Sequence, residues 1–408
     1  MRFFKRNKSI ILIDQALFSG TSFLLTLLIA RITDVESFGQ YSAYMLGIYL
    51  LVNATGAFVI QPFQVLLGKS KNISAYISFT FWFQIIVLMF VIGIAFVVMH
   101  YFIPGIPVSI LPFAAGFILH DFARKILLAL NKLIKALLLD TASTVFLVLG
   151  LYFFNQQSGK TINELMQYFA FAYILPFLFI SVLLSPLVFK KDLFIEYLSL
   201  HYKEGKWLFF TAITQWWSGN LFVLASGIYL GASALGALRL AQSLLGVLNI
   251  LLQTFENYVL PQTAFKIISS RQIAISYLGG MSQKAAFLFL PVLGFSFLFA
   301  EQIMVMAGGL EYRSFAYVLR GMTFLYVFIF LGQPIRLIIR ALLLNQHFFY
   351  AYLINLSFAL IFGHFLLSTY GLNGAIAGLI GSQILLIVYW SFVLHNKNIQ
   401  LWKSFISF

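Results

Sequence analysis

The stretch that decides the fold is GALRLAQSLLGVLNILLQTFENYVLP, which runs from Gly236 to Pro261. It is apolar enough for a membrane helix, yet polar residues recur along it at steps of three, seven, four and three: Arg239, Gln242, Asn249, Gln253 and Glu256. These steps place all five on one helical face. A charge at mid-membrane costs about 3 kcal/mol on insertion scales, so this face must meet protein or a water-filled cavity. We interpret it as one wall of a polar pathway. The alternative is a helix whose polar side chains bond only to neighbouring helices.

The composition of the 408-residue chain excludes an ordinary soluble protein. Hydrophobic residues make up 61% and charged residues 9%, whereas soluble domains carry about 25% charged residues. We therefore expect a polytopic membrane protein. The chain has no cysteine, which excludes disulfides, zinc–thiolate sites and cysteine nucleophiles. The first apolar run, residues 10–32, is longer than a signal-peptide core of about 7–15 residues, so we expect it to remain as the first span.

Hydropathy predicts twelve membrane-spanning helices. They lie near residues 10–32, 40–67, 76–99, 108–130, 134–155, 164–187, 207–230, 234–262, 284–306, 317–344, 347–368 and 372–395. All basic residues then fall on the amino-terminal side except Arg31, Lys160, Arg239, Arg313 and Arg320. By the positive-inside rule, both termini are expected to be cytoplasmic. The net charge of +14 thus reflects topology, and no nucleic-acid partner is expected.

Weak internal similarity indicates two halves of six spans each. The polar stripe of the first span recurs in the seventh at a nearly constant offset, and Gly39 recurs as Gly236. The first stripe comprises Gln15, Ser19, Ser22 and Thr26, and the second comprises Thr211, Gln215 and Ser218. We predict an amino-terminal lobe 1–187, a cytoplasmic linker 188–206, a carboxy-terminal lobe 207–395 and a cytoplasmic tail 396–408. Because six is even, the halves share one orientation, and their pseudo-twofold axis should follow the membrane normal around a central cavity.

Arginines near the predicted outer side are candidates for binding an anion. Arg239 and Arg320 lie where basic residues are otherwise scarce, and a guanidinium forms bidentate bonds to phosphate. The alternative is snorkelling to outer lipid headgroups. Gln15 and Gln215 are assigned to the same polar pathway. Trp216 lies deep in its span, where it could stack on a sugar or isoprenoid or simply pack in the core.

Acidic residues within the spans are candidates for coupling transport to an ion. Asp14 and Glu256 are the two assigned here; the alternative for Asp14, near the cytoplasmic end of its span, is a local bond or snorkelling. The end of the fourth span carries four further polar residues: His120, Asp121, Arg124 and Lys125. We interpret that group as positive-inside anchoring, with Asp121 and Lys125 as an i, i+4 pair.

The sequence gives no sign of an enzyme. It contains no H-E-x-x-H, no phosphate-binding loop and no G-x-S-x-G. No predicted loop is long enough to fold as a domain. We therefore expect no catalytic residue, no metal and no cofactor.

Three segments resemble bacterial polysaccharide and O-antigen flippases. They are DQALFSGTSFLLTLLIARITDVESFG from Asp14, HDFARKILLALNK from His120, and the run from Trp207 through Asn249 followed by FENYVLP. These flippases belong to the multidrug/oligosaccharidyl-lipid/polysaccharide exporter superfamily. The resemblance spans all twelve predicted helices but includes no motif that defines a substrate.

The resemblance implies a function and partners. Such flippases move undecaprenyl-pyrophosphate-linked oligosaccharide across the bacterial cytoplasmic membrane by alternating access, alongside polysaccharide polymerases and other assembly proteins. By position, Arg239 and Arg320 would meet the pyrophosphate. Two other functions remain open: a cation-coupled multidrug exporter of the same superfamily, which would use Asp14, Asp140, Glu256 and Glu301, and a membrane-embedded polymerase or glycosyltransferase.

Overall fold

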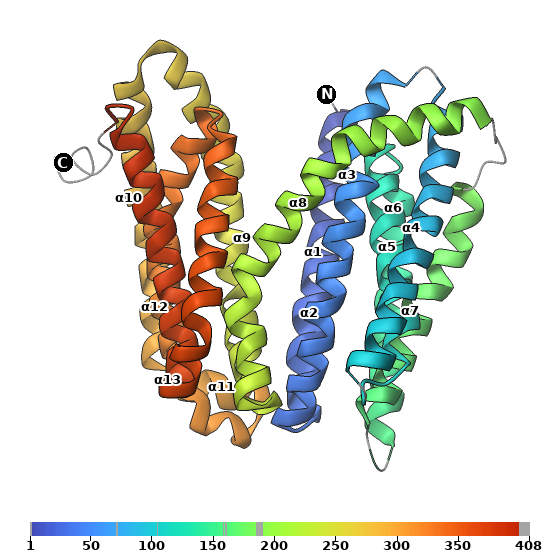
Figure 1. Cartoon of the computed structure of the whole chain (residues 1–408), viewed down its shortest axis with the longest axis horizontal. Coiled ribbons are helices and arrows are strands. Elements are labelled where there is room, and N and C mark those ends of the chain that lie inside the picture. Colours follow the sequence, from blue (N-terminus) through green and yellow to red (C-terminus); the bar gives the residue numbers. More distant parts are fainter. Residues whose placement is uncertain are drawn as a thin grey trace. The chain divides into compact units, whose positions relative to one another are not determined.

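The computed structural model is helical throughout most of the residues it describes, which are 2–70, 72–103, 105–157, 159, 161–184 and 191–399 (Figure 1). The α-helices are α1 Arg2–Ile32, α2 Val35–Phe58, α3 Ile60–Leu66, α4 Ile73–Phe102, α5 Ile110–Ala129, α6 Leu133–Gln156, α7 Ile162–Leu184, α8 Lys191–Leu230, α9 Ala232–Ser269, α10 Arg271–Leu298, α11 Ala300–Gly308, α12 Ala316–Ala341 and α13 Asn345–His395. Two short 3-10 helices, η1 Leu67–Lys69 and η2 Leu310–Phe315, complete the described elements. The predicted all-α class is confirmed.

The predicted spans coincide with helical segments. Nine helices in the described ranges are long and apolar enough to cross a membrane. One of them, α13, contains two predicted spans, because Gly371 adopts a φ of 57° and divides it. α5 and α8 are not among the nine. α5 is excluded because Asp121, Arg124 and Lys125 all lie within its length. The predicted linker 188–206 is helical from Lys191 onward, as the first part of α8.

The helices form two compact units, so the two-lobe organisation is confirmed. Unit 1 comprises Met1–Leu25 and Tyr44–Ile213, and unit 2 comprises Thr26–Ala43 and Thr214–Phe408. In unit 1, α5, α6 and α7 pack together, whereas in unit 2 the packing joins α9, α10, α12 and α13. The contacts place 26–43 in unit 2 and 191–206 in unit 1, which differs from the predicted lobe boundaries. Three helices, α1, α2 and α8, therefore begin in one unit and end in the other.

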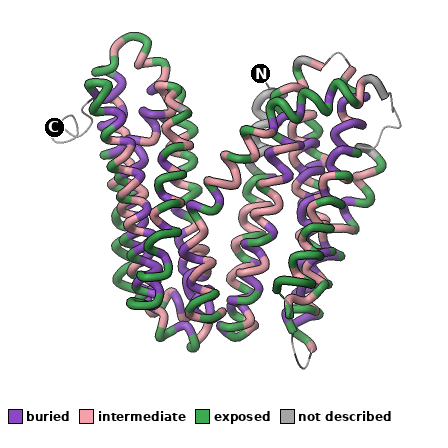
Figure 2. The backbone as a smooth tube through the Cα atoms, viewed as in Figure 1, coloured by how far each residue is buried: buried purple, intermediate pink, exposed green. Residues whose placement is uncertain are grey.

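Large apolar side chains cover much of the exposed surface. Phe90 is 68% exposed, Phe179 78% and Phe287 84%. Exposed positions recur along the helices of both units, as Figure 2 shows. Apolar surface on this scale is unfavourable in water, but lipid tails cover it without cost.

Within unit 2, the start of α2 packs tightly against the start of α9. A Cβ atom added at Gly39 would collide with the carbonyl group of Ala232, and one added at Gly236 would lie 2.7 Å from the carbonyl oxygen of Val35. The two glycines of the predicted repeat thus contact each other, because neither carries a side chain that would hold the helices apart.

Two hydrogen bonds further fix the turn between α1 and α2 in unit 2. Arg31 Nη1 donates to the carbonyl oxygen of Val305 at 2.8 Å. The backbone N–H of Val35 donates to Glu311 Oε2 at 3.3 Å. This turn is therefore an integral part of unit 2, although it connects two helices that continue into unit 1.

Candidate functional site

The predicted polar stripe lies on one side of α9. Leu238, Ala241, Leu248 and Leu252, each one residue before a stripe position, are buried. The five polar stripe residues themselves are half-buried or exposed. The helix is thus apolar on the face that packs and polar on the adjacent face, as the spacing predicts.

The first part of this stripe interacts with α12 of the same unit. Arg239 Nη1 donates to Gln242 Oε1 at 2.9 Å. The Asn249 side chain and Arg239 both lie close to Tyr326 of α12. These contacts join three of the predicted site residues to one another through a helix that sequence periodicity did not identify as their neighbour.

The far end of the stripe carries an ion pair. Glu256 pairs with Arg340 of α12, and Gln333 Nε2 donates to Glu256 Oε2 at 3.4 Å. Gln253, one turn earlier on α9, is exposed. The stripe therefore forms a polar seam between α9 and α12, and the charge of Glu256 is compensated by Arg340 rather than by Arg239.

The remaining candidates of unit 2 lie on α8 and α12. Gln215 is exposed, and its Nε2 lies 3.5 Å from the hydroxyl of Tyr352. Trp216 is only 8% exposed and meets the ring of Trp217 edge-on at 5.3 Å. That burial favours the packing interpretation of Trp216. Arg320 is exposed on α12.

A buried ionic cluster lies in unit 1, where α1, α5 and α6 meet. Arg124 Nε donates to Asp140 Oδ2 and Arg124 Nη2 to Asp14 Oδ2, both at 2.7 Å. Gln15 Oε1 also accepts from Nη2, at 3.3 Å. The guanidinium carbon lies 4.2 Å from the centre of the Phe18 ring. One guanidinium thus neutralises part of the charge of two carboxylates that come from different helices.

The anchoring interpretation of Arg124 is therefore wrong. Its side chain is 7% exposed, far too little for a residue that would mark the membrane boundary. The predicted pair of Lys125 and Asp121 is confirmed, with 2.7 Å between Nζ and Oδ2. The signal that could have located the cluster is the presence of Asp14 and Asp140 in apolar spans, because buried carboxylates require a partner.

A cavity of about 80 Å³ adjoins this cluster and is lined in part by His120, Asp140, Ser143 and Thr144. Asp140 Oδ1 lies 3.3 Å from His120 Nε2, but neither atom forms a hydrogen bond. The volume accommodates water, and the two atoms could share a proton. Among the described residues, no group of three or more His, Cys, Asp or Glu side chains is arranged to hold a metal ion.

Several solved structures share this fold. A lipid II flippase, MurJ, in an inward closed conformation gives a TM-score of 0.73 at 15% identity, covering 97% of this chain and 88% of that chain. An inward-facing multidrug resistance MATE family transporter of the MOP superfamily gives 0.70 at 15% identity, covering 95% and 96%. A MOP superfamily transporter from Pyrococcus furiosus, described as having a binding pocket of reverse polarity, gives 0.61 at 15% identity, covering 96% of each chain.

The sequence itself matches neither a protein-family model nor a curated protein. The likeness is therefore one of architecture, and it extends over nearly the whole chain. The chain has the two-lobed, all-helical fold of MOP superfamily transporters.

Proposed function

We propose that this chain is a MOP superfamily transporter that flips undecaprenyl-pyrophosphate-linked oligosaccharide from the cytoplasmic to the outer leaflet of a bacterial cytoplasmic membrane. The product would serve cell-surface polysaccharide synthesis, such as that of O-antigen, by a polymerase and other assembly proteins. The fold shared with a lipid II flippase supports a lipid-linked substrate. The two-unit organisation supports transport by alternating access.

One observation carries the choice of an anionic substrate. Each acidic residue on which a cation exporter would depend is paired with an arginine. The pairs are Asp14 and Asp140 with Arg124, Glu256 with Arg340, and Glu301 with Arg313. A carboxylate that already bonds a guanidinium attracts an organic cation less, because the arginine compensates its charge. Arg239, in contrast, bonds the neutral amide of Gln242 on the polar stripe of α9.

This arrangement suits the physical problem of moving a charged headgroup through lipid. A pyrophosphate and its sugars are strongly hydrated, so they cross only if protein groups replace the water. The polar seam of α9 offers amides and a guanidinium for this purpose, while the isoprenoid tail stays in the surrounding lipid. Opening to one side and then the other would release the headgroup in the opposite leaflet.

The experiment is a flipping assay in proteoliposomes with a labelled undecaprenyl-pyrophosphate-linked saccharide. We expect Arg239→Ala to slow flipping about tenfold or more, because a hydrogen bond to a charged group contributes about 1.5–3 kcal/mol. Arg239→Lys should reduce the flipping rate less than Arg239→Ala, since lysine keeps the charge but not the bidentate geometry. The control is Arg313→Ala in the same unit, where an exposed ion pair is removed. Equal rates for Arg239→Ala and the unchanged protein would refute the role of Arg239.

A cation-coupled multidrug exporter is the second candidate. The MATE likeness and the unbonded Asp140 Oδ1 beside His120 favour it, since a proton bound there would complete a hydrogen bond. Expression in a drug-sensitive host separates the two functions. The flippase proposal predicts no gain of resistance, together with loss of surface glycan when the native gene is deleted. Resistance with unchanged surface glycan would establish the exporter instead.

A further inference from the structure

One face of α8 packs against the end of α2 inside unit 1. The face consists of residues four apart: Tyr197, His201, Gly205 and Phe209. The Phe209 ring meets the Phe58 ring edge-on at 5.4 Å, and a Cβ atom added at Gly205 would lie 3.3 Å from Phe58 Cα. His201 Nδ1 lies 3.2 Å from the Phe58 carbonyl oxygen. Three successive turns of α8 therefore contact Phe58, the last residue of α2.

The Phe58 carbonyl needs this contact for a reason that the sequence contains. In a continuous helix it would accept a hydrogen bond from the N–H of residue 62. Residue 62 is Pro62, which has no N–H, and the chain breaks between α2 and α3 at this point. His201 supplies the missing donor from another helix. Since a carbonyl only accepts, the proton is on Nδ1 of His201, and Nε2 accepts from the Tyr76 hydroxyl at 2.7 Å.

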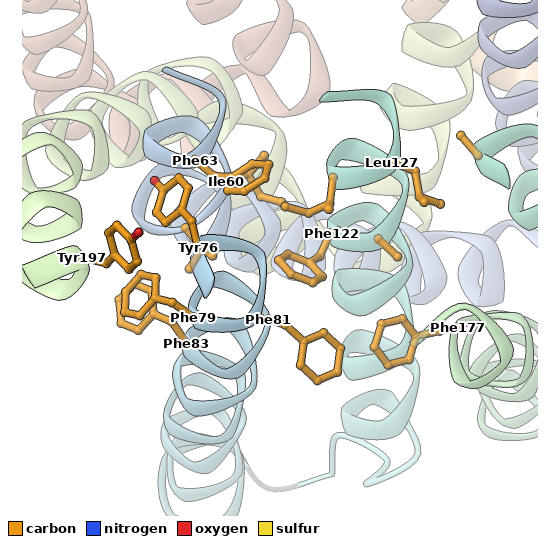
Figure 3. Close-up of a cluster of buried hydrophobic side chains, with 14 of the residues drawn as sticks. Ile60, Phe63, Tyr76, Phe79, Phe81, Phe83, Phe122, Leu127, Phe177 and Tyr197 are labelled. Carbon is orange, nitrogen blue, oxygen red and sulfur yellow. The ribbon is translucent and has the colours of Figure 1, made fainter. Parts of the chain in front are cut away.

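The hydrogen-bond chain lies in an aromatic environment. His201 is 0% exposed. Figure 3 shows Tyr76 of α4 among Phe63, Phe79 and Tyr197, which come from three different helices. Because Tyr76 and His201 are buried from solvent, the hydrogen bonds of Tyr76 and of the Phe58 carbonyl cannot be lost without leaving buried groups unpaired.

We propose that His201 is a pin that fastens α8 to the break between α2 and α3, so that these elements move together. The connectivity gives the pin its importance. α2 enters unit 1 from unit 2 between Ala43 and Tyr44, and α8 leaves unit 1 for unit 2 between Ile213 and Thr214. His201 thus joins the unit 1 portions of two of the helices that link the units. It acts as a positioning residue, independently of which substrate is carried.

The first test uses substitutions that replace one donor to the Phe58 carbonyl, His201, by another, the backbone N–H of residue 62. His201→Leu removes both hydrogen bonds and should lower the apparent melting temperature. Pro62→Ala restores an N–H in the helix itself, so the double variant Pro62→Ala, His201→Leu should recover at least half of that loss. The matched control is Pro176→Ala, which changes the proline inside α7 of the same unit. Recovery no greater with Pro62→Ala than with Pro176→Ala would overturn the assignment of His201 as the donor.

The second test measures the fastening itself. Because the chain has no cysteine, Tyr202→Cys on α8 and Val65→Cys on α3, both exposed, can be spin-labelled without background. Pulsed electron resonance should give a narrow distance distribution for the otherwise unchanged protein and a broad one for His201→Leu. The distribution should stay broad with Pro62→Ala added, since that change restores the donor but not the link between helices.

His201→Gln keeps a donor and an acceptor on one side chain and should keep the narrow distribution, which protects the test against a poorly folded leucine variant. If the distance distribution of His201→Leu is as narrow as that of the unchanged protein, His201 does not fasten these helices and the proposal is refuted. Neither measurement uses a substrate, so failure here would be separate from failure of the transport proposal.

Discussion

At the residue scale, Arg124 is the clearest case of a side chain whose role depends on distant partners. It bonds Asp14 and Asp140, which are far from it in sequence or on another helix. Removing one member of a buried ion pair costs about 3–5 kcal/mol, since the remaining charge has no partner. Here the remaining charges would be two carboxylates, so repulsion between them would add to the cost.

We therefore expect Arg124→Gln to reduce the yield of folded protein sharply, as measured by size-exclusion chromatography in detergent. The yield of Arg124→Lys should lie between those of Arg124→Gln and the unchanged protein. An ammonium keeps the charge but cannot bond two carboxylates in the same fork geometry. Adding Asp14→Asn to Arg124→Gln removes one repelling charge and should restore part of the yield. If Arg124→Gln folds as well as the unchanged protein, the cluster has no structural role.

His201 provides a test of pH dependence at the same scale, in the part of α8 that precedes the predicted span 207–230. Burial lowers the pKa of His201 from about 6.5 to about 4. Between these values the unfolded chain binds a proton that the folded chain does not, so stability falls as the pH falls from about 6.5 to 4, by up to about 1.4 kcal/mol per pH unit. The melting temperatures of the unchanged protein and His201→Leu should therefore converge over this range. A constant difference would contradict a buried neutral histidine.

At the element scale, periodicity predicted which face of a helix is polar but not which helix lies opposite. The stripe on α9 could be read directly from the spacing of Arg239 and its neighbours. The contribution of Tyr326 and Arg340 from α12 could not, because contacts between distant segments leave no local pattern. For a similar reason, the sequence did not predict that the linker 188–206 is helical from Lys191 onward. From the sequence alone, His201 and Gly205 were assigned to a loop. In the structure, both contact Phe58 at the break that Pro62 causes between α2 and α3.

The close approach of α2 and α9 gives a prediction about glycines. Gly39→Ala and Gly236→Ala should each lower the melting temperature, because the added Cβ atom meets backbone of the other helix. Gly47→Ala on α2 and Gly246→Ala on α9 are the controls, since nothing lies within 4 Å of a Cβ at either position. In those two, alanine should be neutral or stabilising by up to about 1 kcal/mol. Equal effects at all four positions would show that the contact does not matter.

At the scale of the whole molecule, composition and hydropathy were enough to predict an all-helical membrane protein, and weak internal similarity was enough to predict its two lobes. The lobe boundaries were harder, because they depend on contacts. Residues 26–43 belong to unit 2 through the packing of Gly39 and the bond from Arg31, neither of which hydropathy detects.

The orientation in the membrane is a whole-molecule prediction that rests on the distribution of basic residues. A membrane-impermeant maleimide should label Leu310→Cys in intact cells and Tyr202→Cys only after the cells are opened. Both positions are exposed, at 76% and 60% respectively, so accessibility to the reagent depends on the side of the membrane. The reverse labelling pattern would show that the termini face outward.

The three helices that pass from one unit to the other restrict how the chain can change in length. Inserting one residue into an α-helix turns everything beyond it by about 100° and shifts it by about 1.5 Å. An insertion near Ile213 of α8 would turn the part of this helix that belongs to unit 2, so that Phe222 and Ser218 would lose their contacts with Phe358 and Asn355. Insertions and deletions should therefore be excluded at these three crossings and confined to connections within a unit, such as 103–109 between α4 and α5.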